Sequence, residues 1–126
     1  MQLGSWHKQG APFYGWDVAY SRSFDLPREG SKVVKLGGWN GTVCEVWVNG
    51  ERAGMILTKP YKLDITKYTK EGINDIEVRC TGSLYNLYGP HFHDYKGRAT
   101  PGSWYVNAEP TKAENYRLFE YGLTEE

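Results

Sequence analysis

The chain has 126 residues, with 15 Lys plus Arg balanced by 15 Asp plus Glu, and therefore carries no formal net charge. This length fits one domain over residues 1–126, and the balanced charge lacks the basic surplus with which domains bind nucleic acid or anionic membranes. No stretch reaches the roughly 20 apolar residues of a membrane span, and the first residues lack the charged and apolar regions of a signal peptide. Aromatic residues make up 15% of the chain at a mean hydropathy of −0.63, so the rings serve either a small core or an exposed binding surface.

Alternating apolar residues predict strands in the first part of the chain. In Val18–Phe24 alternate residues are apolar except for Arg22, which predicts a half-buried strand with Tyr20 and Phe24 in the core. A second strand is expected over Ser31–Trp39.

The strongest strand signal lies in Thr42–Val48. Cys44, Val46 and Val48 share one face of this segment, and the residues between them share the other. Asn-Gly, the preferred pair for a type I′ hairpin turn, follows at once. The next strand, Glu51–Met55, is therefore expected to return antiparallel.

The remaining chain reads as short strands separated by Gly and Pro. A single helical turn with Thr66 as its N-cap is expected over Thr66–Glu71, and Gly82–Ser103 is the longest region without a strand signal. Seven or eight short strands at this spacing favour an all-β jelly-roll β-sandwich. The further predicted strands are Tyr61–Ile65, Asp75–Cys80, Trp104–Asn107 and Tyr116–Tyr121.

Two cysteines fall on the apolar phase of their predicted strands. Cys44 lies beside Val46, and Cys80 lies beside Val78. Strand cysteines commonly pack as small apolar side chains, which favours two buried thiols. A bridge between neighbouring strands is the alternative that the sequence leaves open.

Several motifs give the chain a resemblance to a known family. Three runs, Gly41–Gly54, Pro60–Thr66 and Glu71–Val78, combine a Val-Asn-Gly hairpin, a Pro-x-x-x-Asp-Ile-Thr turn and a Gly-x-Asn-x-Ile-x-Val strand entry. They resemble galactose-binding-like domains, in particular the sugar-binding jelly roll of family 2 and related bacterial glycoside hydrolases. Ser83–His91 and Tyr116–Leu123 resemble terminal accessory domains of such enzymes.

The resemblance implies a non-catalytic, carbohydrate-binding accessory domain that belongs to a larger glycosidase. It implies an oligo- or polysaccharide ligand, a parent catalytic domain as partner, and an extracellular or periplasmic location. No cofactor is expected; structural calcium occurs in some galactose-binding-like domains, but the chain has no dense Asp and Asn loop to supply its oxygen ligands.

Sugar-binding sites combine flat aromatic surfaces with a few polar groups that bond the hydroxyls. Trp39, between glycines, is one candidate platform, with burial in the core as its alternative. The segment from residue 85 to 94 is the richest candidate, and the alternative is a loop packed on its own or another domain. Its candidate binding residues are Tyr85, Asn86, Tyr88, His91, Phe92, His93 and Asp94.

Metal binding and catalysis are the less favoured hypotheses. His91, His93 and Asp94 suggest a metal site by their types. Zinc, however, requires three or four protein ligands, and no Cys or further His lies near these residues in sequence. Glycosidases need two carboxylates across a cleft, and the acids here fall on strand faces and turns. Three hypotheses follow in order: a carbohydrate-binding module, an interaction module that packs on a catalytic domain, and a small hydrolase.

Overall fold

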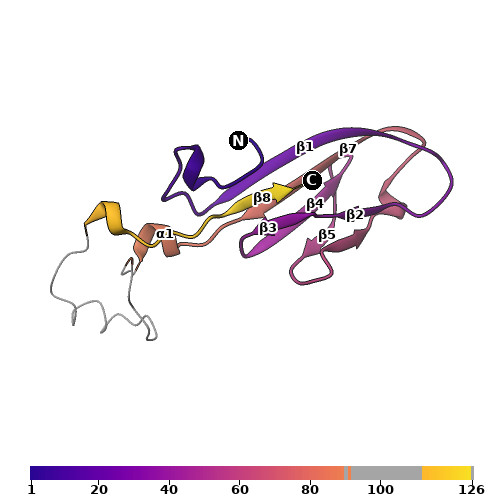
Figure 1. Ribbon diagram of the computed structural model, residues 1–126. Helices are drawn as coiled ribbons and strands as arrows, with labels where there is room; N and C mark the ends of the chain where they lie inside the picture. The colour runs from indigo at the N-terminus through magenta and orange to yellow at the C-terminus, as the bar shows by residue number, and fades with distance from the viewer. Residues whose placement is uncertain (90, 92–111, 126) are drawn as a thin grey trace.

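The computed structural model describes residues 1–89, 91 and 112–125. These residues form a mostly β fold with antiparallel sheets and little helix (Figure 1). Within them, no helix is long and apolar enough to cross a membrane. The elements in chain order are η1 (His7–Gln9), β1 (Asp17–Leu26), β2 (Val33–Lys35), β3 (Gly38–Asn40), β4 (Val43–Val48), β5 (Glu51–Ile56), β6 (Lys62–Asp64), η2 (Thr66–Tyr68), β7 (Gly72–Thr81), α1 (Tyr85–Tyr88), η3 (Ala113–Asn115) and β8 (Gly122–Glu125).

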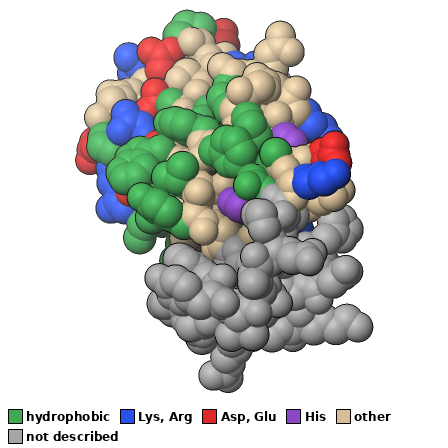
Figure 2. Space-filling model, turned by 90° about the vertical axis from the view of Figure 1, so that its left-hand side faces the viewer, with side chains coloured by type: hydrophobic (Ala, Val, Ile, Leu, Met, Phe, Trp, Pro, Cys, Tyr) green, Lys and Arg blue, Asp and Glu red, His purple; other side chains and the backbone are tan. Residues whose placement is uncertain are grey.

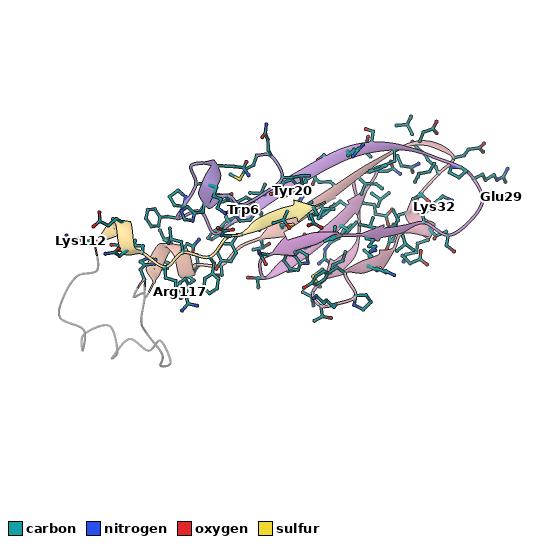
Figure 3. All side chains as sticks on the ribbon, in the orientation of Figure 1. Trp6, Tyr20, Glu29, Lys32, Lys112 and Arg117 are labelled. Carbon is teal, nitrogen blue, oxygen red and sulfur yellow. The ribbon has the colours of Figure 1, made fainter. Side chains whose placement is uncertain are left out.

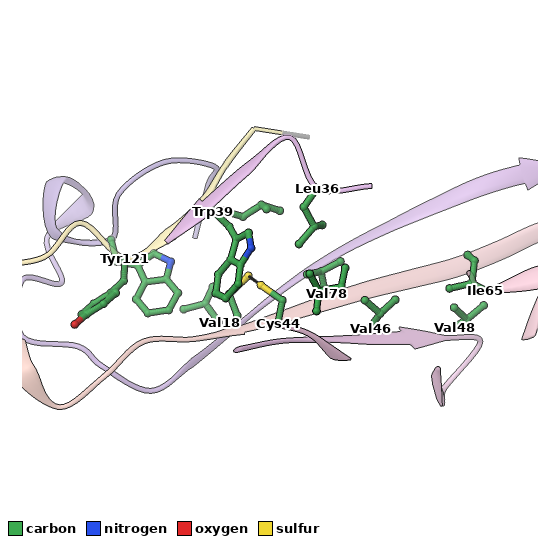
Figure 4. Packing of buried hydrophobic residues seen from close by; sticks show 13 residues of the cluster. Val18, Leu36, Trp39, Cys44, Val46, Val48, Ile65, Val78 and Tyr121 are labelled. Carbon is green, nitrogen blue, oxygen red and sulfur yellow. Dashed lines mark hydrogen bonds between the residues drawn. The ribbon is translucent and has the colours of Figure 1, made fainter. Parts of the chain in front are cut away.

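One sheet of four strands has the order β1-β7-β4-β5, and two antiparallel pairs, β2-β6 and β3-β8, complete the described strands. The hydrophobic core joins side chains of this sheet to side chains from the two pairs and the segments beside them. Figure 4 shows Val46 and Val78 of the sheet on one side of this core, with Leu36 and Trp39 on the other. This pairing confirms an antiparallel all-β fold, and the jelly-roll sandwich stays a prediction.

The predicted central hairpin is confirmed. Cys44, Val46 and Val48 of β4 are all fully buried, whereas the residues between them are half-buried on the opposite face. The turn residues Asn49 and Gly50 have φ angles of 52° and 83°, as a type I′ turn requires. The chain then returns antiparallel in β5.

The helical turn after β6 differs from its prediction in the capping residue. Ile65 occupies the N-cap position, and Thr66 is the first residue of η2. The Asp64 carboxylate accepts hydrogen bonds from the Thr66 hydroxyl and backbone N–H at 2.6 and 2.8 Å. These bonds lower the pKa of Asp64 below its ordinary value.

Two strand predictions are wrong because the backbone does not keep one hydrogen-bonding partner strand along the predicted segment. Ser31–Trp39 is broken after Lys35, since β2 pairs with β6 whereas β3 pairs with β8. Tyr116–Tyr121 is not a strand in the structure, where β8 begins at Gly122. The predicted strand Trp104–Asn107 lies outside the described residues.

The predicted core is confirmed near the start of β1 and wrong at its far end. Val18 is buried, and Tyr20 packs against the core, where its hydroxyl accepts a hydrogen bond from the indole N–H of the buried Trp6 at 2.7 Å (Figure 3). Phe24 is 39% exposed. It lies opposite Asn74, on the part of the β1-β7 ribbon that extends away from the N-terminus (Figure 1).

The two cysteines are buried, as the strand phase predicts, and both are thiols in this structure. They lie directly opposite each other in the β4-β7 ladder. A hydrogen bond with Cys80 and burial both raise the pKa of Cys44 far above its ordinary value.

Candidate functional site

The end of the domain that carries α1 is held together by one asparagine side chain. Asn86 is 1% exposed. Its amide group donates a hydrogen bond to the Phe119 carbonyl and accepts one from the Phe119 N–H, both at 2.8 Å. These bonds use the backbone groups of Phe119 that a strand would pair, and they fix the segment before β8 against α1.

Aromatic rings form a continuous cluster over this end. The Tyr85 and Phe119 rings meet edge to face with centroids 4.8 Å apart. Tyr85 also contacts His91, whose ring stacks on Tyr116 at 4.6 Å. Phe119 in turn lies against Tyr121 with centroids 6.0 Å apart. Such ring pairs prefer edge-to-face or offset stacking, so the cluster holds its rings in fixed orientations.

A hollow of about 460 Å³ opens beside this cluster. Its lining residues include aromatic and polar types, and its volume lies within the range of about 300–1,000 Å³ that small-molecule sites span. The lining residues are Asn40, Gly41, Thr42, Ser83, Tyr85, Phe119, Glu120 and Tyr121.

Several polar groups of the hollow are already oriented by neighbours. The hydroxyls of Ser83 and Tyr121 are hydrogen-bonded to each other, and the Thr42 hydroxyl donates to the Gly82 carbonyl at 2.6 Å. The Glu120 carboxylate forms a solvent-exposed ion pair with Lys8 at 2.7 Å. The acidic residue of the lining is therefore already paired with a cation.

The structure places the predicted site residues in different environments. Tyr85 lines the hollow and His91 lies in the ring cluster, whereas Tyr88 is exposed on α1. Asn86 is buried with both ends of its amide bonded to backbone, so it positions the site rather than offering free polar groups. Phe92, His93 and Asp94 lie outside the described residues.

Trp39 is not an exposed platform in this structure. It is 9% exposed and belongs to the hydrophobic core, where its ring meets Tyr61 edge to face at 5.8 Å. The neighbouring glycine explains the burial, because a Cβ on Gly41 would lie 2.9 Å from the indole ring. The glycine thus gives the ring room to turn inward.

The outward Trp47 of β4 is confirmed as a residue of the outer sheet face. The Arg79 guanidinium lies 4.4 Å from its ring centroid, and a hydrogen bond from Arg79 lowers the pKa of Glu77. Trp47 is therefore covered by a cation and is a poorer stacking platform than the rings at the α1 end.

Sequence reasoning missed part of the hollow. Asn40 and Thr42 lie next to the predicted platform Trp39 in sequence, and Phe119 and Glu120 lie in a segment predicted as a strand. The sequence signal that could have indicated this part of the hollow is the pair of aromatic residues, Phe119 and Tyr121, on either side of Glu120. Among the described residues, no group of three or more His, Cys, Asp and Glu side chains is placed to hold a metal ion.

No protein-family model matches the chain, but segments of known proteins are similar to it. A protein of Formosa agariphila named "Putative beta-glucuronidase" is 26% identical over 87 residues, which are 64% of this chain and 8% of that protein. The solved structure of a rhamnosidase from Novosphingobium sp. PP1Y matches with a TM-score of 0.65 and 29% identity, over 91% of this chain and 11% of that chain.

The chain is homologous to one segment of large glycoside hydrolases. It spans about a tenth of the length of these two proteins. A segment that covers so small a share of a glycosidase is consistent with an accessory domain. The more specific resemblance to galactose-binding-like domains stays a prediction.

Proposed function

We propose that this chain is a non-catalytic, carbohydrate-binding accessory domain of a glycoside hydrolase, working outside the cytoplasm and holding glycan in the hollow beside Tyr85 and Phe119. The observation that carries the proposal is the hollow itself, where two residues with rings held edge to face share the lining with polar residues. The homology to segments of large glycosidases supports the choice of a glycan as ligand.

The two rings suit the two kinds of surface on a sugar. Phe119 is 46% exposed, so its ring can pack against the C–H face of a pyranose, while the edge-to-face Tyr85 forms an adjacent wall. Asn40 is exposed at the rim and can both donate to and accept from hydroxyl groups.

The charge of the hollow favours a neutral glycan. Its lining includes Glu120 and, among the described residues, no Lys or Arg. Lys8 reaches the site but is already paired with that carboxylate. A uronic acid would bring a second negative charge without a free cation, so we expect neutral oligosaccharides to bind more tightly.

Affinity electrophoresis tests the proposal with neutral galactan, xylan and glucomannan against acidic polygalacturonate. We expect a neutral polysaccharide to retard the protein, and Phe119→Ala to weaken binding about fivefold, because ring contacts contribute on the order of 1 kcal/mol. Phe24→Ala is the matched control, since this phenylalanine has similar exposure at a distance from the hollow. Retention by none of these polysaccharides, or equal retention of both variants, would contradict the proposal.

A second candidate function is an interaction module that packs on another domain. Its support is a group of exposed apolar side chains near α1. Leu87 and Tyr88 are exposed on α1, and Trp16, whose carbonyl accepts a hydrogen bond from the Gly82 N–H, is 66% exposed. Figure 2 shows hydrophobic side chains on this face of the domain. Large exposed apolar patches mark interaction sites. Concentration-dependent self-association that Trp16→Ser with Leu87→Ser removes, in a protein that binds no glycan, would favour this function.

A further inference from the structure

We propose that Cys44 and Cys80 form an intramolecular disulfide that joins β4 to β7 when the chain folds in an oxidising compartment. Both residues are thiols in this structure, with their sulfur atoms 2.7 Å apart (Figure 4). The inference does not depend on the sugar-binding proposal, because it concerns the core between the sheet layers.

The strand register brings the two side chains together. Cys44 and Cys80 are direct partners in the antiparallel β4-β7 ladder. Opposite residues in such a ladder have Cα atoms about 4.5 or 5.5 Å apart, and both spacings fall within the range of about 4.4–6.8 Å found in disulfides. The backbone therefore already satisfies the condition for a bridge.

The side chains also point at each other rather than past each other. Both residues are completely buried, and the hydrogen bond between the sulfurs shows that each lies within reach of the other. Val46 and Val78, the next inward pair of the same two strands, pack beside them. This packing fixes the relative position of the sulfurs.

The step requires a disulfide oxidant, such as glutathione disulfide or a thiol–disulfide oxidoreductase. One cysteine thiolate attacks the oxidant and releases one reduced thiol, which leaves a mixed disulfide. The second cysteine thiolate attacks the protein sulfur of that mixed disulfide and releases the second thiol. Two protein thiols thus lose two electrons and two protons to the oxidant.

Burial sets when the step takes place. Neither sulfur is accessible in the folded domain, and the raised pKa of Cys44 disfavours the attacking thiolate there. We therefore expect oxidation during folding, and slow oxidation of the folded, reduced domain that low concentrations of urea accelerate.

The experiment refolds the reduced chain in a buffer of reduced and oxidised glutathione, then unfolds it with iodoacetamide and measures the intact mass. We expect a protein about 2 Da lighter than the reduced form, with no carbamidomethyl group and with one cross-linked pair of tryptic peptides. Two carbamidomethyl groups, or a stable glutathione adduct, would overturn the proposal.

Thermal unfolding of the same samples supplies a second readout. The bridge links residues 36 positions apart, and a loop of that length predicts a melting temperature about 10 °C or more above that of the reduced protein. Cys44→Ala with Cys80→Ala is the control and should melt at one temperature in both buffers. An oxidised protein that melts no higher than the reduced one would contradict a bridge that fits the native strand pairing.

Discussion

Replacement of Asn86 by alanine should loosen the end of the domain that carries the hollow. The side chain makes two hydrogen bonds to the backbone of Phe119, each 2.8 Å long, from a position that is 1% exposed. At about 1 kcal/mol for each bond, the expected loss is about 2 kcal/mol of the free energy of unfolding. The two hydrogen bonds are only partly buried, so water can reach the orphaned N–H and C=O groups and keep the loss near this value.

Urea denaturation at neutral pH measures the loss, and Asn115→Ala is the control because Asn115 is exposed in η3. The control should change the free energy of unfolding by less than about 0.5 kcal/mol. Asn86→Asp separates the two bonds, since a carboxylate still accepts from the Phe119 N–H but donates nothing to its carbonyl. An Asn86→Ala protein as stable as the control would refute this account of the site.

Three further predictions concern the fold. Asp64→Asn should lower stability at neutral pH and have a progressively smaller effect below about pH 4. The reason is that the hydrogen bonds from Thr66 hold the folded pKa of Asp64 below its ordinary value of 3.8, and this stabilisation is lost once the carboxylate is protonated. Urea midpoints across this pH range measure the loss of stability, and a loss that is unchanged at pH 2 would contradict the assignment. Gly15→Ala should lower the melting temperature markedly in calorimetry, because a Cβ there would lie 2.1 Å from the Ser83 carbonyl oxygen; unchanged melting would mean that these segments do not touch. Val46→Ala should cost about 2 kcal/mol in urea denaturation by leaving a cavity in the fully buried layer, and a loss below about 0.5 kcal/mol would place Val46 outside the core.

Local sequence rules predicted the hairpin of β4 and β5 because its determinants are local. Alternating residues set which face of β4 is buried, and Asn49-Gly50 sets the turn. The Asp64 contact is equally local, since its carboxylate accepts a hydrogen bond from a backbone N–H two residues away.

The site was harder to predict because its contacts join distant parts of the chain. Asn86 bonds a backbone 33 residues away, and those bonds turn a predicted strand into an irregular segment that lines the hollow. Trp39 shows the same limit, since glycine neighbours are compatible with a displayed ring or a buried one. Trp39 is buried because β3 pairs with β8 and its ring packs on Tyr61.

Binding of a neutral glycan in the hollow beside Tyr85 and Phe119 can be measured by nuclear magnetic resonance. The titration uses the ¹⁵N-labelled chain and a neutral oligosaccharide from the best-retained polysaccharide. We expect amide shifts at Gly41, Thr42, Ser83, Tyr85 and the segment 119–121. No shifts at millimolar oligosaccharide, or shifts gathered instead on the outer sheet face around Trp47, would contradict it.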